Sequence, residues 1–200
     1  MLAQCLGIPH ISTGDMLRDR IRQGIAATAV VATMQSGALV SDEVVNRIVA
    51  ARLSEPDAAK GFILDGYPRT VAQAEHLNGW LDGANIGEVV IHLAVDYNII
   101  IARLTGRRQC PRCGTLYNLA SKPPQVDTLC DLDGATLVIR DDDRAEVIRE
   151  RLEAYERQTR PVLDYLATAG RRVVAVEGDE HPPDVIFQKI CQALEANDRS

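Results

Sequence analysis

The architecture of this 200-residue chain is limited above all by a short apolar run, Phe62-Ile63-Leu64, that ends at Asp65-Gly66. A run of this length before a turn is typical of a buried strand, and the glycine permits a tight turn. Pro68 then fixes the backbone just before Arg69. The strand therefore brings a carboxylate and a guanidinium to one edge of a sheet, where ligands of open α/β sheets collect. The plainer alternative is a strand, a polar turn and a helix start that bind nothing.

Similar apolar runs alternate with helical segments along the rest of the chain. Residues 89–95 and 171–176 read as further strands, each followed by an acidic residue. Helices are expected at residues 2–6, 16–35 with a break at Gly24, 42–54, 71–81, 97–105, 144–168 and 182–196. Strands that alternate with helices predict the α/β class with a doubly wound parallel sheet.

The charge balance excludes some partners. The net charge of −6 disfavours nonspecific binding to nucleic acid or to a membrane surface. Nearly all positive charge is arginine, because lysine occurs only at positions 60, 122 and 189, so a local basic cleft is still compatible with the composition. No apolar run reaches transmembrane length and the first residues do not form a signal peptide, which predicts a cytoplasmic protein.

Five cysteines, three of them clustered, favour a metal site over a disulfide framework. Cys110-Pro-Arg-Cys113 and Cys130-Asp-Leu-Asp133 are two knuckles of identical spacing. Three thiolates and one carboxylate can complete a closed, tetrahedral and therefore structural zinc site. The segment 106–143 is too small to fold around its own core, and a metal supplies the missing free energy. The alternative is a lobe of reduced cysteines held by hydrogen bonds. Cys5 and Cys191 are expected to be ordinary buried thiols.

Several arginines stand at the ends of the expected elements or beside the two ends of segment 106–143. Each alone is most often a solvated surface charge. Gathered around a carboxylate at a strand end they suit phosphoryl transfer, in which catalysis is positioning plus neutralisation of phosphate charge. The candidates are Arg18, Arg69, Arg103, Arg107, Arg140 and Arg151.

Over essentially its whole length the sequence resembles the bacterial adenylate kinases of the long-lid type. The zinc knuckles are part of this resemblance. The other segments that carry it are Ile11-Ser-Thr-Gly-Asp-Met-Leu-Arg18, Gly37-Ala-Leu-Val40, Gly61-Phe-Ile-Leu-Asp-Gly-Tyr-Pro-Arg69, Gly106-Arg-Arg108, Arg140-Asp-Asp-Asp143 and Arg149-Glu-Arg151. The resemblance implies a nucleoside monophosphate kinase fold, and a reaction in which Mg-ATP phosphorylates AMP to give two ADP.

The resemblance also implies a core with two mobile parts, and a role for each site residue. The core would comprise residues 1–11, 41–105 and 144–200, with an AMP-binding lobe at 12–40 and a lid at 106–143. Asp65 would organise Mg²⁺. The AMP site would comprise Thr13, Arg18, Leu39, Val40, Gly66, Tyr67, Pro68, Arg69, Gln73, Arg140 and Arg151, with Gln73 at the adenine edge. The ATP site would comprise Arg103, Arg107, Leu116, Tyr117 and Glu180. Arg140 and Arg151 would move in with the lid, Cys110, Cys113, Cys130 and Asp133 would hold Zn²⁺, and the protein would be a monomer that binds neither nucleic acid nor membranes.

The sequence departs from the family at one point. The family begins with a strand, the loop Gly-x-x-Gly-x-Gly-Lys and a helix, whereas residues 1–9 match only the end of that helix. Lys60 precedes a strand and cannot replace the loop lysine. A start codon assigned too far downstream is the simplest explanation. For the 200 residues as written we expect a gap in the middle of the sheet and little or no kinase activity, because the ATP phosphates lose their backbone N–H donors.

Two other functions fit the same residues. One is a kinase for another nucleoside monophosphate, although Gln73 and Thr13 favour adenine. The other is a non-catalytic remnant that binds AMP and zinc. A zinc-ribbon protein that binds nucleic acid is disfavoured, because the chain is acidic and its aromatic residues do not alternate with basic ones.

Overall fold

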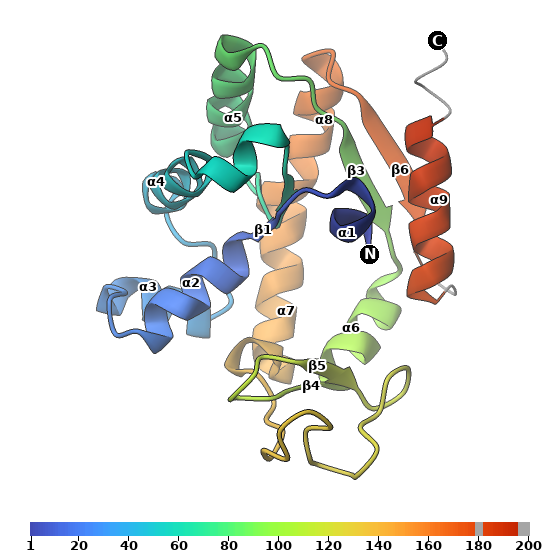
Figure 1. Cartoon of the computed structure of the whole chain (residues 1–200). Coiled ribbons are helices and arrows are strands. Elements are labelled where there is room, and N and C mark those ends of the chain that lie inside the picture. Colours follow the sequence, from blue (N-terminus) through green and yellow to red (C-terminus); the bar gives the residue numbers. More distant parts are fainter. Residues whose placement is uncertain (179–181, 196–200) are drawn as a thin grey trace.

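In a computed structural model, which describes residues 1–178 and 182–195, short parallel strands alternate with helices (Figure 1). The α/β class predicted from the sequence is confirmed. The first half contains α1 (Leu2–Leu6), β1 (His10–Ser12), α2 (Thr13–Arg22), α3 (Thr28–Gln35), α4 (Asp42–Leu53), the 3₁₀ turn η1 (Pro56–Lys60), β2 (Ile63–Asp65), α5 (Val71–Ala84), β3 (Val90–Ala94) and α6 (Tyr97–Thr105). The second half contains β4 (Arg107–Gln109), β5 (Leu116–Asn118), the 3₁₀ turn η2 (Asp141–Asp143), α7 (Ala145–Ala154), the π-helical turn η3 (Tyr155–Thr159), α8 (Arg160–Thr168), β6 (Val173–Glu177) and α9 (Pro183–Glu195).

The parallel strands form two separate pairs. β1 pairs with β2 in a register that sets Ser12 opposite Asp65, and β3 pairs with β6 so that Ala94 lies opposite Glu177. Within residues 1–178 and 182–195 no strand joins the two pairs into one sheet. β6 lies between α8 and α9 in Figure 1, so this pair is covered from two sides. β3 and β6 both end toward the lid in Figure 1, and the parallel register of β1 with β2 sets their last residues side by side.

The largest buried cluster holds β1 and β2 against α4. The buried side chains of α4 recur at helical spacing, with Val45, Val49 and Leu53 on one face. They pack with Ile11 of β1 and with Tyr67, which follows β2. This spacing buries one stripe of the helix and leaves the opposite stripe to solvent. The cluster fixes the loop after β2, which carries the functional side chains.

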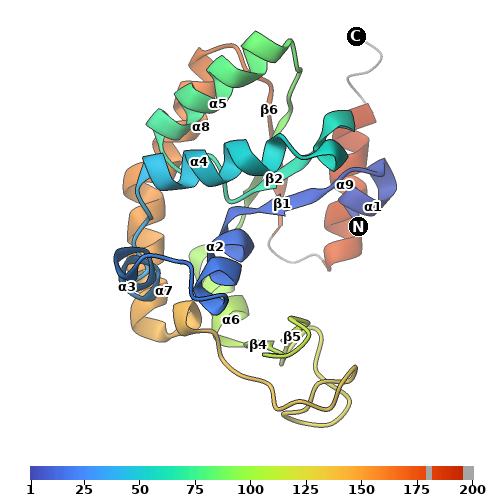
Figure 2. The ribbon, with the colours of Figure 1, turned by 60° about the vertical axis from the view of Figure 1, so that its left-hand side comes forward.

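Residues 106–143, for which we keep the name lid from the sequence prediction, lie at one end of the molecule, as Figures 1 and 2 show. Its only regular elements among the described residues are the antiparallel strands β4 and β5 and the turn η2. Its buried cluster contains Cys110, Tyr117, Cys130 and Leu137. Two of these four side chains are cysteines, so little apolar surface stabilises the lid.

The structure corrects some details of the sequence prediction. The helix expected at 144–168 is divided by η3. Pro161 explains the division, because proline lacks an N–H and its ring clashes with the carbonyl four residues earlier, and a π turn removes that conflict. Cys5 is exposed, so the expectation that it is an ordinary buried thiol was wrong. No helix of the described residues is both long and apolar enough to cross a membrane.

Candidate active site

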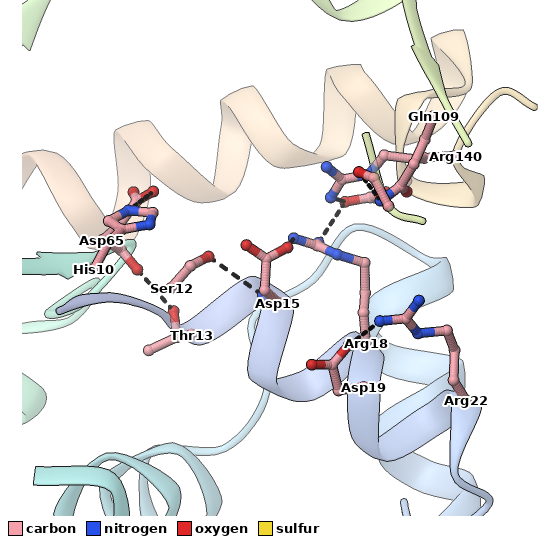
Figure 3. Close-up of polar contacts among 12 residues, drawn as sticks. His10, Ser12, Thr13, Asp15, Arg18, Asp19, Arg22, Asp65, Gln109 and Arg140 are labelled. Atoms are coloured by element: carbon pink, nitrogen blue, oxygen red, sulfur yellow. Dashed lines mark hydrogen bonds and ion pairs between the residues drawn. The ribbon is translucent and has the colours of Figure 1, made fainter. Parts of the chain in front are cut away.

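The site is built at the ends of β1 and β2. Thr13 begins α2 directly after β1, and its hydroxyl donates to the carbonyl oxygens of Gly66 at 2.9 Å and of Asp65 at 3.3 Å. Gly66 has φ +72, a conformation that glycine adopts without strain. The carboxylate of Asp65 is 60% exposed, and Oδ2 lies 3.0 Å from Nε2 of His10 (Figure 3). An exposed carboxylate thus stands at the strand end, as the sequence predicted.

Arg69 lies directly behind this turn. Its Nε donates to the carbonyl oxygen of Gly66 at 2.9 Å. A Cβ on Gly66 would stand 2.7 Å from Nη2 of Arg69, so the glycine is also needed for this close approach. Burial lowers the pKa of Arg69 and the charge of Arg151 lowers it further, whereas Asp65 raises it. The charge state of Arg69 is therefore influenced both by Asp65 at the strand end and by Arg151 on α7.

Asp142 gathers arginines from three segments. Arg140 donates to both of its oxygens, from Nε at 3.1 Å and from Nη2 at 3.0 Å. Nη1 of Arg18 lies 3.5 Å from Oδ2, and Nη1 of Arg151 lies 3.6 Å from the same oxygen. Arg18 also pairs with Asp15 at 2.6 Å, which Figure 3 shows beside Arg140. A single carboxylate thus joins the lobe helix α2, the end of the lid and α7.

Asp143 binds the neighbouring arginines. Its side chain is fully buried, and Arg107 Nη1 lies 3.5 Å from its oxygens. Arg151 Nη1 lies 3.3 Å from Oδ1, and Arg140 Nε lies 3.9 Å from Oδ2. Oδ2 has no hydrogen-bond partner, although Arg107 Nη1 and Arg140 Nε lie within ion-pair distance of it.

The two aspartates respond oppositely to this environment. Burial raises the pKa of Asp142, but the hydrogen bonds and charge of Arg140, with Arg151 and Arg18, outweigh it and the pKa lies below its ordinary value. Burial raises the pKa of Asp143 above its ordinary value, although Arg107 and Arg140 oppose the shift. Burial also lowers the pKa of Arg107. The five guanidinium groups of Arg18, Arg69, Arg107, Arg140 and Arg151 outnumber the carboxylates that face them, so the cluster attracts anions.

Gln73 occupies a buried position at the start of α5. Its side chain is only 2% exposed. Its Oε1 accepts from the Arg69 N–H at 2.8 Å, and its Nε2 donates to Asp42 Oδ1 at 2.7 Å. Leu39 is half-buried, and Val40 belongs to the buried cluster with α4. The loop between α3 and α4 therefore runs close to the loop after β2.

The residues expected to bind ATP have different settings. Arg103 donates from Nη2 to the carbonyl oxygen of Gly178 at 2.8 Å, which ties α6 to the end of β6. Leu116 is 44% exposed. Tyr117 is buried in the lid, where its hydroxyl accepts from the Asp131 N–H at 2.8 Å. Glu180 lies outside the described residues.

The lid brings together the four residues expected to bind zinc. The sulfur and carboxylate atoms of Cys110, Cys113, Cys130 and Asp133 all lie within 4.8 Å of one another. Cys110 Sγ is 3.4 Å from both Asp133 oxygens, and Cys113 Sγ is 3.6 Å from Cys130 Sγ. Three soft sulfur ligands with one carboxylate at this separation fit a tetrahedral Zn²⁺.

Comparison with known proteins decides the family. The family model described as adenylate kinase matches residues 1–171. The chain belongs to the adenylate kinase family. Its relatives include the adenylate kinase of Thermoanaerobacter sp. (strain X514), 44% identical over 195 residues that cover 96% of this chain and 89% of that protein. The adenylate kinase of Thermotoga neapolitana is 47% identical over 167 residues, 82% and 76% of the two chains. That of Anaeromyxobacter dehalogenans is 44% identical over 189 residues, 93% and 87%. The resemblance inferred from the motifs is confirmed.

For this adenylate kinase family member, sequence reasoning overlooked three acidic residues that organise the site. Asp142 and Asp143 were noticed only as part of a motif, and the run Arg140–Asp143 beside a hinge was the available signal. Asp42 entered the prediction only as the first residue of the helix expected at 42–54. Nothing in the sequence marks its contact with Gln73, which is 31 residues away.

Proposed function

We propose that this chain carries out the reversible transfer of the γ-phosphoryl group from Mg-ATP to AMP, giving two ADP. The observation that supports this most is the gathering of Arg18, Arg107, Arg140 and Arg151 around Asp142 and Asp143, together with Arg69, on which the charges of Arg18, Arg151 and the exposed Asp65 all act. Phosphoryl transfer needs little covalent chemistry from a protein and much positive charge around the transferred group. The cluster supplies that charge from the lobe, the lid and the core.

Each group has a proposed task. Arg18 and Arg69 bind the AMP phosphate, and Arg103 and Arg107 bind those of ATP. Arg140 and Arg151 close over the transferred group. Guanidinium forks suit phosphate oxygens because they donate two parallel hydrogen bonds. The remaining AMP contacts are assigned to Thr13, Leu39, Val40, Gly66, Tyr67, Pro68 and Gln73, and the remaining ATP contacts to Leu116, Tyr117 and Glu180.

Two metal ions are proposed. The Asp65 carboxylate fits the outer sphere of Mg²⁺, because it is exposed and, among the described residues, pairs with the side chain of His10 alone. Magnesium would neutralise phosphate charge and align the two nucleotides. Zn²⁺ would bind Cys110, Cys113, Cys130 and Asp133 with a structural role.

We propose that two parts of the molecule, the AMP-binding lobe and the lid, close over the core. The core is assigned to 1–11, 41–105 and 144–200, the AMP-binding lobe to 12–40 and the lid to 106–143. Closure brings Arg140 and Arg151 over the nucleotides and excludes water that would hydrolyse ATP. We also propose a cytoplasmic monomer, with no role in binding nucleic acid or membranes.

The reaction is tested by a coupled assay for ADP formation with AMP, GMP, CMP and UMP as acceptors. AMP is expected to be the preferred acceptor, and Arg151→Ala to lower turnover by at least about 10²-fold, the scale for loss of one preorganised donor. A preference for another monophosphate, or an Arg151→Ala variant as active as the unmodified protein, would refute the assignment.

A second candidate is a non-catalytic module that binds AMP and zinc. This candidate concerns residues 1–200 alone, which contain no glycine-rich loop followed by lysine. If the second candidate holds, a polypeptide of these residues alone binds AMP but turns over slowly or not at all. Calorimetry with AMP and the coupled assay, run on this polypeptide and on one extended by a strand and such a loop, separate the two functions. Equal turnover by both polypeptides would contradict this part of the proposal.

A further inference from the structure

The side-chain amide of Gln73 is held by partners that each have only one possible role. Its Oε1 faces the backbone N–H of Arg69, and a backbone N–H can only donate. Its Nε2 faces Oδ1 of Asp42, and a carboxylate can only accept. The orientation of this amide is therefore dictated by its neighbours.

Asp42 is itself held in place. Thr70 accepts a hydrogen bond from the backbone N–H of Gln73 at 3.1 Å. The single hydroxyl proton of Thr70 then donates to Oδ2 of Asp42 at 3.0 Å. Both oxygens of Asp42 thus accept from the same turn at the start of α5. A flip of the Gln73 amide would set its oxygen against a carboxylate and its NH₂ against an N–H, two mismatches at a side chain that is 2% exposed.

One N–H of the Gln73 amide and one lone pair of its oxygen have no partner among the described residues. In the proposed function these two groups face the edge of the AMP base. A 6-amino purine offers a donor at position 6, whereas a 6-oxo purine offers an acceptor there. A nucleotide whose phosphate is gripped by arginines cannot turn its base over, so the fixed amide fits only one of the two patterns.

We infer that Asp42 determines specificity, because it holds the Gln73 amide in the orientation that pairs with a 6-amino purine and rejects a 6-oxo purine. This inference rests on the proposed function, in which Gln73 meets the base of AMP. Asp42 does not contact the nucleotide in this scheme and acts as a positioning residue. Selection of AMP over IMP and GMP follows from a carboxylate that never touches the base.

The test compares the Kd values of AMP and IMP by isothermal titration calorimetry, because these nucleotides differ only in the 6-substituent and the N1 proton. The unmodified chain is expected to bind AMP roughly 10- to 100-fold more tightly than IMP, the range for leaving buried polar groups unpaired. Asp42→Asn keeps the shape but can donate as well as accept, so this ratio is expected to fall about tenfold. The matched control is Glu43→Gln, which removes the same charge from the exposed neighbouring position of α4 and is expected to leave the ratio unchanged.

Two further variants keep the inference falsifiable if Asp42→Asn does not fold. Thr70→Ala removes the hydrogen bond to Asp42 and is expected to lower the ratio about threefold. Thr70→Ser keeps the hydroxyl and should restore it. Ratios in Asp42→Asn and Thr70→Ala equal to that of the unmodified chain would overturn the role of Asp42 and leave the proposed function standing.

Other outcomes separate the two claims. Equal affinity of the unmodified chain for AMP and IMP would overturn the specificity inference alone. Failure to bind AMP, or a Gln73→Glu variant that binds AMP as tightly as the unmodified chain, would overturn the proposed AMP site and this inference with it.

Discussion

Replacing Asp142 with asparagine removes the charge on which the arginine cluster is centred. The Asp142 side chain is 17% exposed and receives two hydrogen bonds from Arg140, whose own side chain is 9% exposed. Arg18 and Arg151 lie within 3.6 Å of Oδ2. Asparagine keeps one acceptor oxygen, so the contact with Arg140 is weakened and not abolished. The repulsion among the guanidinium groups then increases, because one of the few opposing charges is gone.

The magnitude follows from these contacts. A hydrogen bond between charged groups contributes about 1.5–3 kcal/mol, and removing one partner of a fully buried pair costs about 3–5 kcal/mol. Because Asp142 is partly exposed and one hydrogen bond survives, we expect a loss of about 2–3 kcal/mol at pH 7. In a chain of this size each kcal/mol lowers Tm by about 2–4 °C, so Tm should fall by roughly 5–10 °C.

The pH dependence of the loss has a definite sign. The folded-state pKa of Asp142 lies below its ordinary value, so its stabilisation is fully present above the ordinary carboxyl pKa and disappears as the pH falls through the folded-state pKa. The difference between Asp142→Asn and the unmodified protein should therefore be constant near neutrality and shrink below about pH 4.

Urea denaturation of both proteins between pH 2.5 and 7 measures this difference directly. The control is Asp141→Asn, the adjacent aspartate, which is 64% exposed and, within the part of the chain that the structure describes, pairs only with the exposed Arg144 at 2.7 Å. It should change stability by less than about 0.5 kcal/mol. Equal effects of the two substitutions at pH 7, or a difference for Asp142→Asn that persists undiminished at pH 2.5, would refute the account of the cluster.

Three further predictions concern the lid and the hinges. The purified chain should contain one equivalent of zinc by elemental analysis. The Cys110→Ser variant should contain none, whereas Cys191→Ser, which lies outside the cluster, should keep it. Zinc retained in Cys110→Ser would contradict the assignment. Tyr117→Phe should destabilise the lid by about 1–2 kcal/mol, because the Asp131 N–H loses its buried acceptor. Hydrogen exchange of the lid amides measures this loss, and unchanged protection would argue against a stabilising role for the Tyr117 hydroxyl. Gly37→Ala should lower Tm more than Gly24→Ala. Both glycines have positive φ, but a Cβ at Gly37 would stand 2.9 Å from the carbonyl oxygen of Val147, whereas a Cβ at Gly24 would meet open space. Equal Tm values for the two variants would count against that packing.

The parts of the site that could be predicted from the sequence are those set by local spacing. The knuckles at Cys110 and Cys130 lie close in the chain, and the run ending at Asp65 has the length and boundaries of a strand. Helix ends were placed less well. The helix expected at 71–81 continues to Ala84, and Asn85 ends it in the left-handed conformation. The end was misplaced because neither glycine nor proline stands at that position.

What could not be predicted depends on residues distant in sequence. The pairing of Arg18 with Asp142 spans 124 positions and that of Gln73 with Asp42 spans 31. Such contacts are fixed by how helices pack on strands, and no local pattern encodes them. Tyr117 shows the same limit. It was expected near the base of ATP, but its hydroxyl is needed inside the lid, and the assignment to ATP remains a prediction.

Asp142 and Asp143, at the end of the lid, explain how several guanidinium groups can lie close together before any nucleotide binds. Arginine stays charged even when burial lowers its pKa, so repulsion among Arg107, Arg140 and Arg151 must be offset by other charges. Asp142 and Asp143 provide that offset, but incompletely, since Asp143 is buried deeply enough to raise its own pKa. The cluster therefore keeps an excess of positive charge at a fixed place. A phosphate that enters it gains attraction to arginines that are already positioned, and the protein does not have to collect them after the ligand arrives.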